Sequence, residues 1–268
     1  MAQARVESAD SVVKVRGGTI FVRRWDPTTV SRNVPLILLH DSLGCVDLWR
    51  DFPATLAGHL GAPVVAYDRL GFGRSSGRTE PPAADFIREE TEEVFPALRG
   101  ELGIADFALF GHSVGGAMAL VIAARLVDSC RAVVSESAQA FVEDRTVSGV
   151  RAAKAQFQQP GQLDRLRRWH GAKAQWVLDA WTEVWLSPEF ASWSLGSNLP
   201  LVRCPLLVIH GDGDEYGSAR FPEFICRHAG GPSEMHILPG CGHVPHRERR
   251  DTVMNLVRRF SPLAATQR

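Results

Sequence analysis

The sequence lacks an excess of charge of either sign. Its 268 residues contain 30 Lys and Arg and 30 Asp and Glu, so the formal net charge at pH 7 is zero. A broad basic surface, on which binding to nucleic acid or to an anionic membrane depends, is therefore not expected. Lysine itself is scarce, with Lys14, Lys154 and Lys173 as its only occurrences. We interpret this scarcity as a bias of composition and not as a functional signal.

The chain also lacks a cysteine pattern and a long apolar run. Its five cysteines are odd in number and scattered, and no two of them form a CxxC pair. They resemble neither a disulfide framework nor a zinc site. The longest apolar run, residues 117–124, is far shorter than the ~20 residues that cross a bilayer. Residues 1–10 have no apolar signal core, so we expect a cytoplasmic protein without a membrane partner.

Motifs for nucleotides and metals are missing too. No G-x-G-x-x-G follows a strand and opens a helix, and no GxxxxGK[ST] phosphate loop is present. No spacing of histidines and cysteines is typical of metal ligands. We therefore expect neither a cofactor nor a bound metal.

What the sequence does contain is an alternation of strand and helix patterns. Two β-branched segments, 12–15 and 19–22, flank a Gly-Gly pair and predict a hairpin. Six further apolar segments read as buried strands: 35–39, 63–67, 105–110, 131–135, 205–209 and 234–238. Helical patterns lie between them at 48–60, 85–102, 114–126 and 251–260. This alternation predicts an α/β fold with a mostly parallel eight-stranded sheet flanked by helices.

The strand rhythm stops between residues 139 and 201, and this stretch holds most of the tryptophans. Five of the seven lie there: Trp169, Trp176, Trp181, Trp185 and Trp193. We predict a core of residues 1–138 and 202–268, with 139–201 inserted as a helical cap. The tryptophans either fix the cap to the core or line a substrate pocket beneath it. Trp176, Trp181 and Trp185 are the candidates for the pocket.

Two clusters of charged residues indicate helix faces that are exposed to solvent. Glu89, Glu90, Glu92 and Glu93 fall mostly on the face opposite the apolar residues of segment 85–102. We expect a solvated face there, and an acidic ligand site is the alternative. The arginines at 165, 167 and 168 are expected to be solvated as well, with binding of a substrate carboxylate as the alternative.

The motif that carries chemistry is Gly111-His112-Ser113-Val114-Gly115, a GxSxG pattern between an apolar strand and a helix. A sharp strand-to-helix turn exposes the serine hydroxyl and points the N–H of Val114 toward a developing oxyanion. The alternative role for Ser113 is that of a helix N-cap. We predict Ser113 as a nucleophile.

A serine nucleophile needs a general base and an acid that orients it. After the strand predicted at 205–209 come Asp212, Asp214 and Glu215, each a candidate acid. The glycine-rich loop after the last predicted strand carries His243 and His246 as candidate bases. His40, His112 and His210 flank strand ends, and we expect structural roles for them.

Together, GHSVG at 111–115, HGDGD at 210–214, GCGHVPHRE at 240–248 and DRLGFGRSS at 68–76 resemble the α/β-hydrolase superfamily. The likeness is greatest to bacterial carboxylesterase-like members with a helical cap. The resemblance implies Asp214 as the acid and His243 as the base. Asp212 could instead cap its loop, and His246 could be a surface, helix-start or pocket residue.

The resemblance also implies the second oxyanion donor. In relatives it is the residue after a His-Gly pair, which here reads His40-Asp41-Ser42, with Asp41 in place of the usual glycine. The N–H groups of Ser42 and Val114 would then form the oxyanion hole. Our hypothesis is that Asp41 holds this loop through its side chain.

These residues predict a serine hydrolase that cleaves small, mainly apolar carboxylic esters through an acyl-enzyme, with water as the second substrate. A lactonase, thioesterase or C–C bond hydrolase would use the same three residues. Acyl transfer to another acceptor, or ligand sensing on the same fold, are further alternatives.

Overall fold

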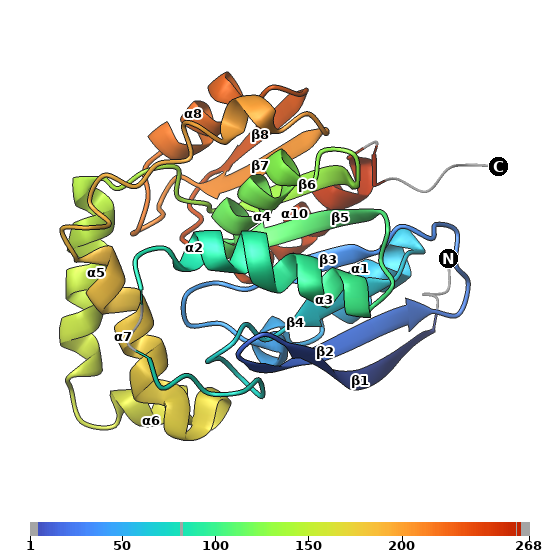
Figure 1. The fold of residues 1–268 in the computed structure, drawn as a ribbon. Coiled ribbons are helices and arrows are strands. Elements are labelled where there is room, and N and C mark those ends of the chain that lie inside the picture. Colours follow the sequence, from blue (N-terminus) through green and yellow to red (C-terminus); the bar gives the residue numbers. More distant parts are fainter. Residues whose placement is uncertain (1–4, 81–82, 261, 264–268) are drawn as a thin grey trace.

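The computed structural model describes residues 5–80, 83–260 and 262–263. Its centre is an eight-stranded sheet in the order β1-β2-β4-β3-β5-β6-β7-β8 (Figure 1). The strands are β1 (Val6–Val15), β2 (Gly18–Pro27), β3 (Leu36–Leu39), β4 (Val64–Tyr67), β5 (Phe107–His112), β6 (Cys130–Glu136), β7 (Leu206–Gly211) and β8 (Ser233–Leu238). Strand β2 pairs antiparallel with β1 and β4, and the pairs from β4 to β8 are parallel. The predicted fold class is confirmed.

The hairpin at the sheet edge is longer than the sequence pattern indicated. Strands β1 and β2 have ten residues each, and their register pairs Val15 with Gly18 across the turn. Gly17 in this turn has φ of 90°, a conformation that favours glycine. Most of β1 is exposed. Its sequence therefore lacks a continuous apolar pattern, and a search for apolar segments found only part of the strand.

Helices cover both faces of the sheet. Helix α4 (Val114–Arg125) packs on one face together with α3 (Phe95–Glu101) and α8 (Arg220–His228), in a single apolar core. Helices α1 (Phe52–Leu60) and α10 (Arg250–Arg259) form a second core on the other face. The central strands β3 to β7 are buried on both faces, which explains their continuous apolar sequences.

Two segments predicted as single helices are interrupted. Segment 48–60 divides into a 3₁₀ turn, η1 (Val46–Trp49), and α1, because Arg50 between them has φ of 55°. Segment 85–102 contains α2 (Phe86–Glu89), a π-helical turn, η2 (Glu90–Val94), and α3. The wide π turn shifts the helix face. Glu90 is consequently buried, so the prediction of a solvated face is wrong for this residue.

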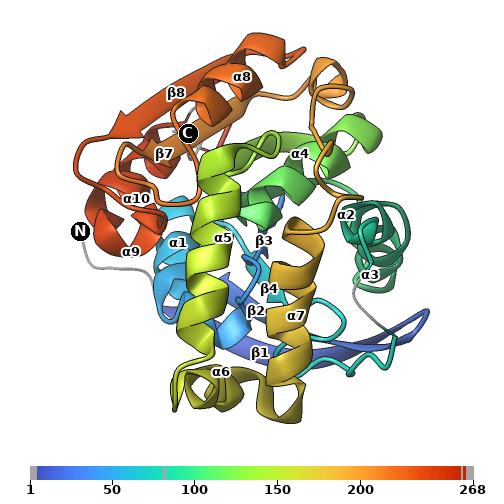
Figure 2. The same ribbon diagram turned by 90° about the vertical axis from the view of Figure 1, so that its left-hand side faces the viewer.

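The predicted cap segment, 139–201, is helical and adds no strand to the described sheet. It contains α5 (Asp144–Phe157), α6 (Gln162–His170), η3 (Gly171–Lys173), α7 (Ala174–Trp185) and η4 (Leu199–Leu201). An isolated bridge between Phe141 and Ser194 joins its two ends. Figures 1 and 2 show α5 and α7 side by side, across the edge of the sheet where the parallel strands end. The division of the chain into core and cap stays a prediction.

Three side chains attach this helical segment to the loops beneath it. The ring of His170 accepts a hydrogen bond from the N–H of residue 73 and contacts the carbonyl of residue 43. Lys173 donates to the carbonyls of residues 72, 73 and 75. The indole N–H of Trp176 donates to the carbonyl of residue 80. Each of these bonds ends on a main-chain atom.

Among the helices of the described ranges, none is long and apolar enough to cross a membrane.

Candidate active site

Ser113 lies on the turn between β5 and α4, in a strained backbone conformation. Its φ is 57° and its ψ is −126°, a combination that non-glycine residues rarely adopt. Neighbouring glycines allow this turn, because a Cβ on Gly111 would collide with the carbonyl of Gly115. A Cβ on Gly115 would in turn collide with the carbonyl of Leu39. The predicted strand-to-helix turn is therefore present, and it holds the serine hydroxyl above the sheet edge.

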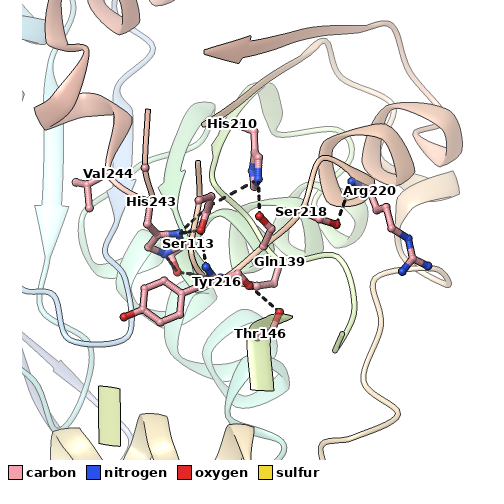
Figure 3. A network of polar contacts seen from close by, with 12 residues as sticks. Ser113, Gln139, Thr146, His210, Tyr216, Ser218, Arg220, His243 and Val244 are labelled. Carbon is pink, nitrogen blue, oxygen red and sulfur yellow. Dashed lines mark hydrogen bonds and ion pairs between the residues drawn. The ribbon is translucent and has the colours of Figure 1, made fainter. Parts of the chain in front are cut away.

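The structure brings Ser113, His243 and Asp214 into one chain of hydrogen bonds, and Figure 3 shows Ser113 and His243 next to each other. The Oγ of Ser113 is 2.9 Å from Nε2 of His243. The Nδ1 of His243 is 2.8 Å from Oδ2 of Asp214 and 2.9 Å from Oδ1. Asp214 is fully buried, and its Oδ1 also accepts the N–H of Tyr216 at 2.8 Å. These contacts fix the carboxylate and, through it, the plane of the imidazole.

The electrostatics of the group suit a base that is oriented by a carboxylate. Burial alone would lower the pKa of His243, but the hydrogen bond and the charge of Asp214 outweigh burial and raise that pKa. Burial would raise the pKa of Asp214, yet its bonds to His243 hold that pKa below its ordinary value. Nearby His210 has a pKa lowered by burial, so it is neutral at pH 7. Asp214 is thus the ionised member of the group.

The other candidate acids and the other candidate base make different contacts from those of Asp214 and His243. Asp212 is exposed and accepts the N–H of Gly240 at 2.7 Å, so it caps the loop as one alternative predicted. Glu215 is exposed at the pocket wall. His246 lies in the first turn of the short helix α9 (Pro245–Glu248), and the interpretation of it as a surface residue is wrong because it is buried. Its ring bonds to the carboxylate of Glu136 at 2.5 Å.

The loop that carries Ser42 is held through a carbonyl group. The carbonyl of Asp41 accepts hydrogen bonds from Nδ1 of His40 at 2.8 Å, from Nη2 of Arg69 at 2.8 Å and from the N–H of Gly44 at 3.2 Å. No peptide bond of the described chain is cis. In a trans peptide the N–H points away from the preceding carbonyl, so the Ser42 N–H points away from Arg69. Ser42 and Ser113 line the same pocket.

The role of the Asp41 side chain in holding this loop stays a hypothesis. Its carboxylate forms no hydrogen bond with any described residue, whereas its carbonyl accepts three. Val114 is the first residue of α4, so its N–H has no partner within the helix. Both predicted oxyanion donors are backbone groups near Ser113.

The pocket above Ser113 has a hollow volume of about 670 Å³, with its open mouth included. Trp181 and Trp185 of α7 line it together with Tyr216 and His243. These two tryptophans also line an adjoining chamber, where they are joined by Trp176. Of the three tryptophans proposed for the substrate pocket, Trp181 and Trp185 line the pocket of Ser113, whereas Trp176 lines only the adjoining chamber, and their contact with substrate stays a prediction.

Glu136 and His246 form a buried pair that the sequence did not reveal. With His112 they are the one group of His, Cys, Asp and Glu side chains in the described ranges whose donor atoms could hold a metal, all lying within 4.8 Å of one another. The 2.5 Å contact of Glu136 with His246 is a hydrogen-bond distance. We assign the group as a structural pair beneath the serine turn, because Glu136 also accepts the backbone N–H of Ser113 through its carbonyl.

A serine on a strand-to-helix turn of a mostly parallel sheet, followed in the chain by an aspartate and a histidine from later loops, defines the α/β-hydrolase class. The model of the alpha/beta hydrolase family matches residues 36–256, and the chain belongs to this family. The resemblance identified from the motifs is confirmed.

Individual relatives and solved structures have low sequence identity to this chain. The chain is 27% identical over 215 residues to serine hydrolase BPHL of Mus musculus, covering 74% of this chain and 68% of that protein. The crystal structure of proline iminopeptidase from Mycobacterium smegmatis has a TM-score of 0.71 and 23% identity, over 94% of this chain and 97% of that one. The enol-lactonase from Burkholderia xenovorans LB400 also has a TM-score of 0.71, with 19% identity over 94% and 99% of the two chains. These two structures share the fold.

Proposed function

We propose that this protein is a serine hydrolase that cleaves small, mainly apolar carboxylic esters. The observation that carries the proposal is the hydrogen-bonded chain of Ser113, His243 and Asp214 at the base of a pocket. A hydroxyl, an imidazole and a buried carboxylate in this order form an activated nucleophile. Membership of the alpha/beta hydrolase family and similarity to a serine hydrolase support the same reaction class.

Each residue has a defined step in the proposed mechanism. His243 takes the proton of Ser113 Oγ through Nε2, while Asp214 keeps the other imidazole proton on Nδ1. Ser113 attacks the ester carbonyl, and the N–H groups of Val114 and Ser42 stabilise the oxyanion. The imidazolium returns its proton to the leaving alcohol. Water, activated by His243, then hydrolyses the acyl-enzyme and restores the serine.

The walls of the pocket support an apolar substrate around the reacting carbonyl. Trp181 and Trp185 contribute large apolar surfaces from α7, and the ring of Tyr216 packs 5.5 Å from that of Trp181. Ser113 and His243 are themselves buried. Such walls exclude bulk water and favour apolar acyl groups.

The test is stopped-flow hydrolysis of 4-nitrophenyl esters from acetyl to octanoyl. We expect a burst of nitrophenolate followed by steady turnover, and S113A should abolish both. A matched control is S11A, since Ser11 lies on the exposed strand β1. Turnover that persists in S113A would refute the mechanism.

A second panel decides the reaction type. It compares an ester with a lactone, a thioester and a prolyl anilide of similar size, because relatives and structural neighbours include an enol-lactonase and proline iminopeptidases. We expect the ester to have the highest kcat/KM. A higher value for the anilide would make the protein a peptidase.

A further inference from the structure

A second chamber adjoins the pocket of Ser113. Ser42, Trp181 and Trp185 line both cavities, so the two cavities share part of their walls. The second chamber has a hollow volume of about 520 Å³, with its open mouth included. The two linings differ in the sign of their charges, because the chamber contains Arg69 and Arg78 beside Glu89 and Glu90, whereas the carboxylates of the Ser113 pocket, Asp41 and Glu215, have no Lys or Arg beside them in the lining. A substrate that fills both cavities would therefore meet cationic groups only at its end in the second chamber.

Arg69 is a buried cation that lacks a paired carboxylate. Arg69 is only 5% exposed, and its Nε has no hydrogen-bond partner among the described residues. Its Nη2 donates to the carbonyl of Asp41, and the guanidinium lies 4.3 Å from the ring centre of Phe72. No carboxylate of the described residues lies within the 4.0 Å that defines an ion pair with this guanidinium. Burial accordingly lowers the pKa of Arg69 from its ordinary value.

The other charges of the chamber already have partners. Arg78 forms an ion pair with Glu89 at 2.6 Å. Glu90 accepts a hydrogen bond from the hydroxyl of Tyr67 at 2.6 Å. Burial raises the pKa of Glu90 while the charge of Arg69 lowers it, so the two side chains act on each other electrostatically but form no ion pair within 4.0 Å. Arg69 is thus the cation of this wall that has no ion pair with a described carboxylate, since Arg78 is paired with Glu89.

A buried charge without a directly paired counter-ion is costly, and a bound anion reduces that cost. Resting on the ester hydrolysis proposed above, we propose that the second chamber binds a carboxylate of the substrate, with Arg69 as its anchor. The substrate class is an ester that is apolar around the scissile bond and carries a carboxylate at its far end, as in a monoester of a short dicarboxylic acid. Guanidinium is suited to this role because it presents several donors in a rigid plane.

The test compares matched esters that differ only in the charged end. One pair carries the difference in the acyl part, mono-4-nitrophenyl glutarate against 4-nitrophenyl pentanoate. The other carries it in the alcohol part, 2-carboxyethyl butanoate against butyl butanoate. We expect kcat/KM of the wild type to favour the carboxylated ester at least tenfold in one pair. Equal values, or a preference for the neutral ester in both pairs, would overturn the subsite.

Variants assign the preference to one residue. R69Q should bring the ratio of the two kcat/KM values close to one, and R69K should keep part of it. Because Arg69 also holds the loop of Ser42, both esters lose rate in R69Q, but their ratio cancels this shared loss. R74Q is the matched control, since Arg74 is a half-exposed arginine of the same loop that pairs with Asp47 outside the chamber. A ratio that R69Q leaves unchanged would refute the role of Arg69.

A binding measurement separates this inference from the proposed reaction. Calorimetry with S113A should show monomethyl glutarate binding at least tenfold more tightly than dimethyl glutarate, and R69Q should remove the difference. If no ester is cleaved but this difference is found, the proposed hydrolysis fails and the carboxylate subsite stands. If esters are cleaved but the two ligands bind equally, the subsite fails and the hydrolysis stands.

Discussion

Replacing Asp214 by asparagine perturbs the proposed site with little change in shape. Asparagine has the same size, and its carbonyl can still accept the N–H of Tyr216, which is 2.8 Å from Oδ1 in the wild type. The carboxylate, however, contacts Nδ1 of His243 through both oxygens, at 2.8 and 2.9 Å. An amide NH₂ on that side needs an acceptor. It therefore favours the tautomer whose proton is on Nε2, and this tautomer cannot take the proton of Ser113.

The magnitude follows from the loss of the working tautomer. Such a change in a serine triad costs about 10⁴-fold in kcat, which is about 5.4 kcal/mol at ~1.36 kcal/mol per tenfold change in rate. The pH dependence of kcat/KM gives a second, independent prediction. Asp214 raises the pKa of His243 against the opposing effect of burial. In D214N burial acts unopposed by this charge, so the pKa falls and the acid limb of kcat/KM moves to lower pH.

The assay measures kcat and kcat/KM for 4-nitrophenyl acetate between pH 4.5 and 9, for wild type and D214N. The matched control is D212N, because Asp212 is exposed and bonds only to the backbone of the same loops. D212N should stay within threefold of the wild type. The reasoning is refuted if D214N retains more than a tenth of wild-type kcat, or if its acid limb stays in place or moves to higher pH.

Three further predictions concern packing and stability. Y67F should lower the free energy of unfolding by about 1.5–3 kcal/mol in urea titrations, because the buried Glu90 loses its donor. The loss should be larger at pH 8 than at pH 5, since the pKa of Glu90 is raised and ionisation demands that donor; equal losses would count against it. W181A should raise the octanoyl-to-acetyl ratio of kcat/KM about tenfold by enlarging both cavities, and an unchanged ratio would remove Trp181 from the acyl wall. G115A should lose more than about 3 kcal/mol or fail to fold, because its Cβ meets backbone carbonyls at the end of β3, whereas G100A, which meets open space in helix α3, should change stability by less than about 1 kcal/mol.

The residues that could be predicted from sequence are those set by local chain geometry. Ser113 follows a buried strand and precedes a helix, and both elements are visible as apolar patterns. Asp214 and His243 follow the ends of β7 and β8, and the carboxyl ends of parallel strands meet at one edge. Strand order and the contact between these loops did not need to be known in advance. The local turns were sufficient to single out Ser113 and to limit the acid and the base to a few candidates, and the resemblance to the α/β-hydrolase superfamily selected Asp214 and His243 among them.

The charged groups of the second chamber could not be predicted in the same way. Glu90 has the spacing of a solvated residue on a regular helix, and only the π turn at Glu90–Val94 rotates it inward. Arg69 lies in a glycine-rich loop whose burial depends on the helices packed over it. Glu136 and His246 are 110 positions apart and become a pair only when β6 and α9 are in place. Each of these depends on tertiary contacts that leave no period in the sequence.

The hydrogen bonds that attach the helical segment to loop 72–80 have a consequence for how substrate specificity can change by mutation. His170, Lys173 and Trp176 all bind main-chain atoms of the loop. These hydrogen bonds are therefore independent of the loop's side chains, provided that the backbone keeps its path. Phe72 is an exception to exchange, because its ring also packs against those of His170 and Trp176. Arg78, which lines the second chamber and pairs with Glu89, can be exchanged without removing a bond to the helices above, so randomising this position alters the charge of the chamber while the attachment is kept.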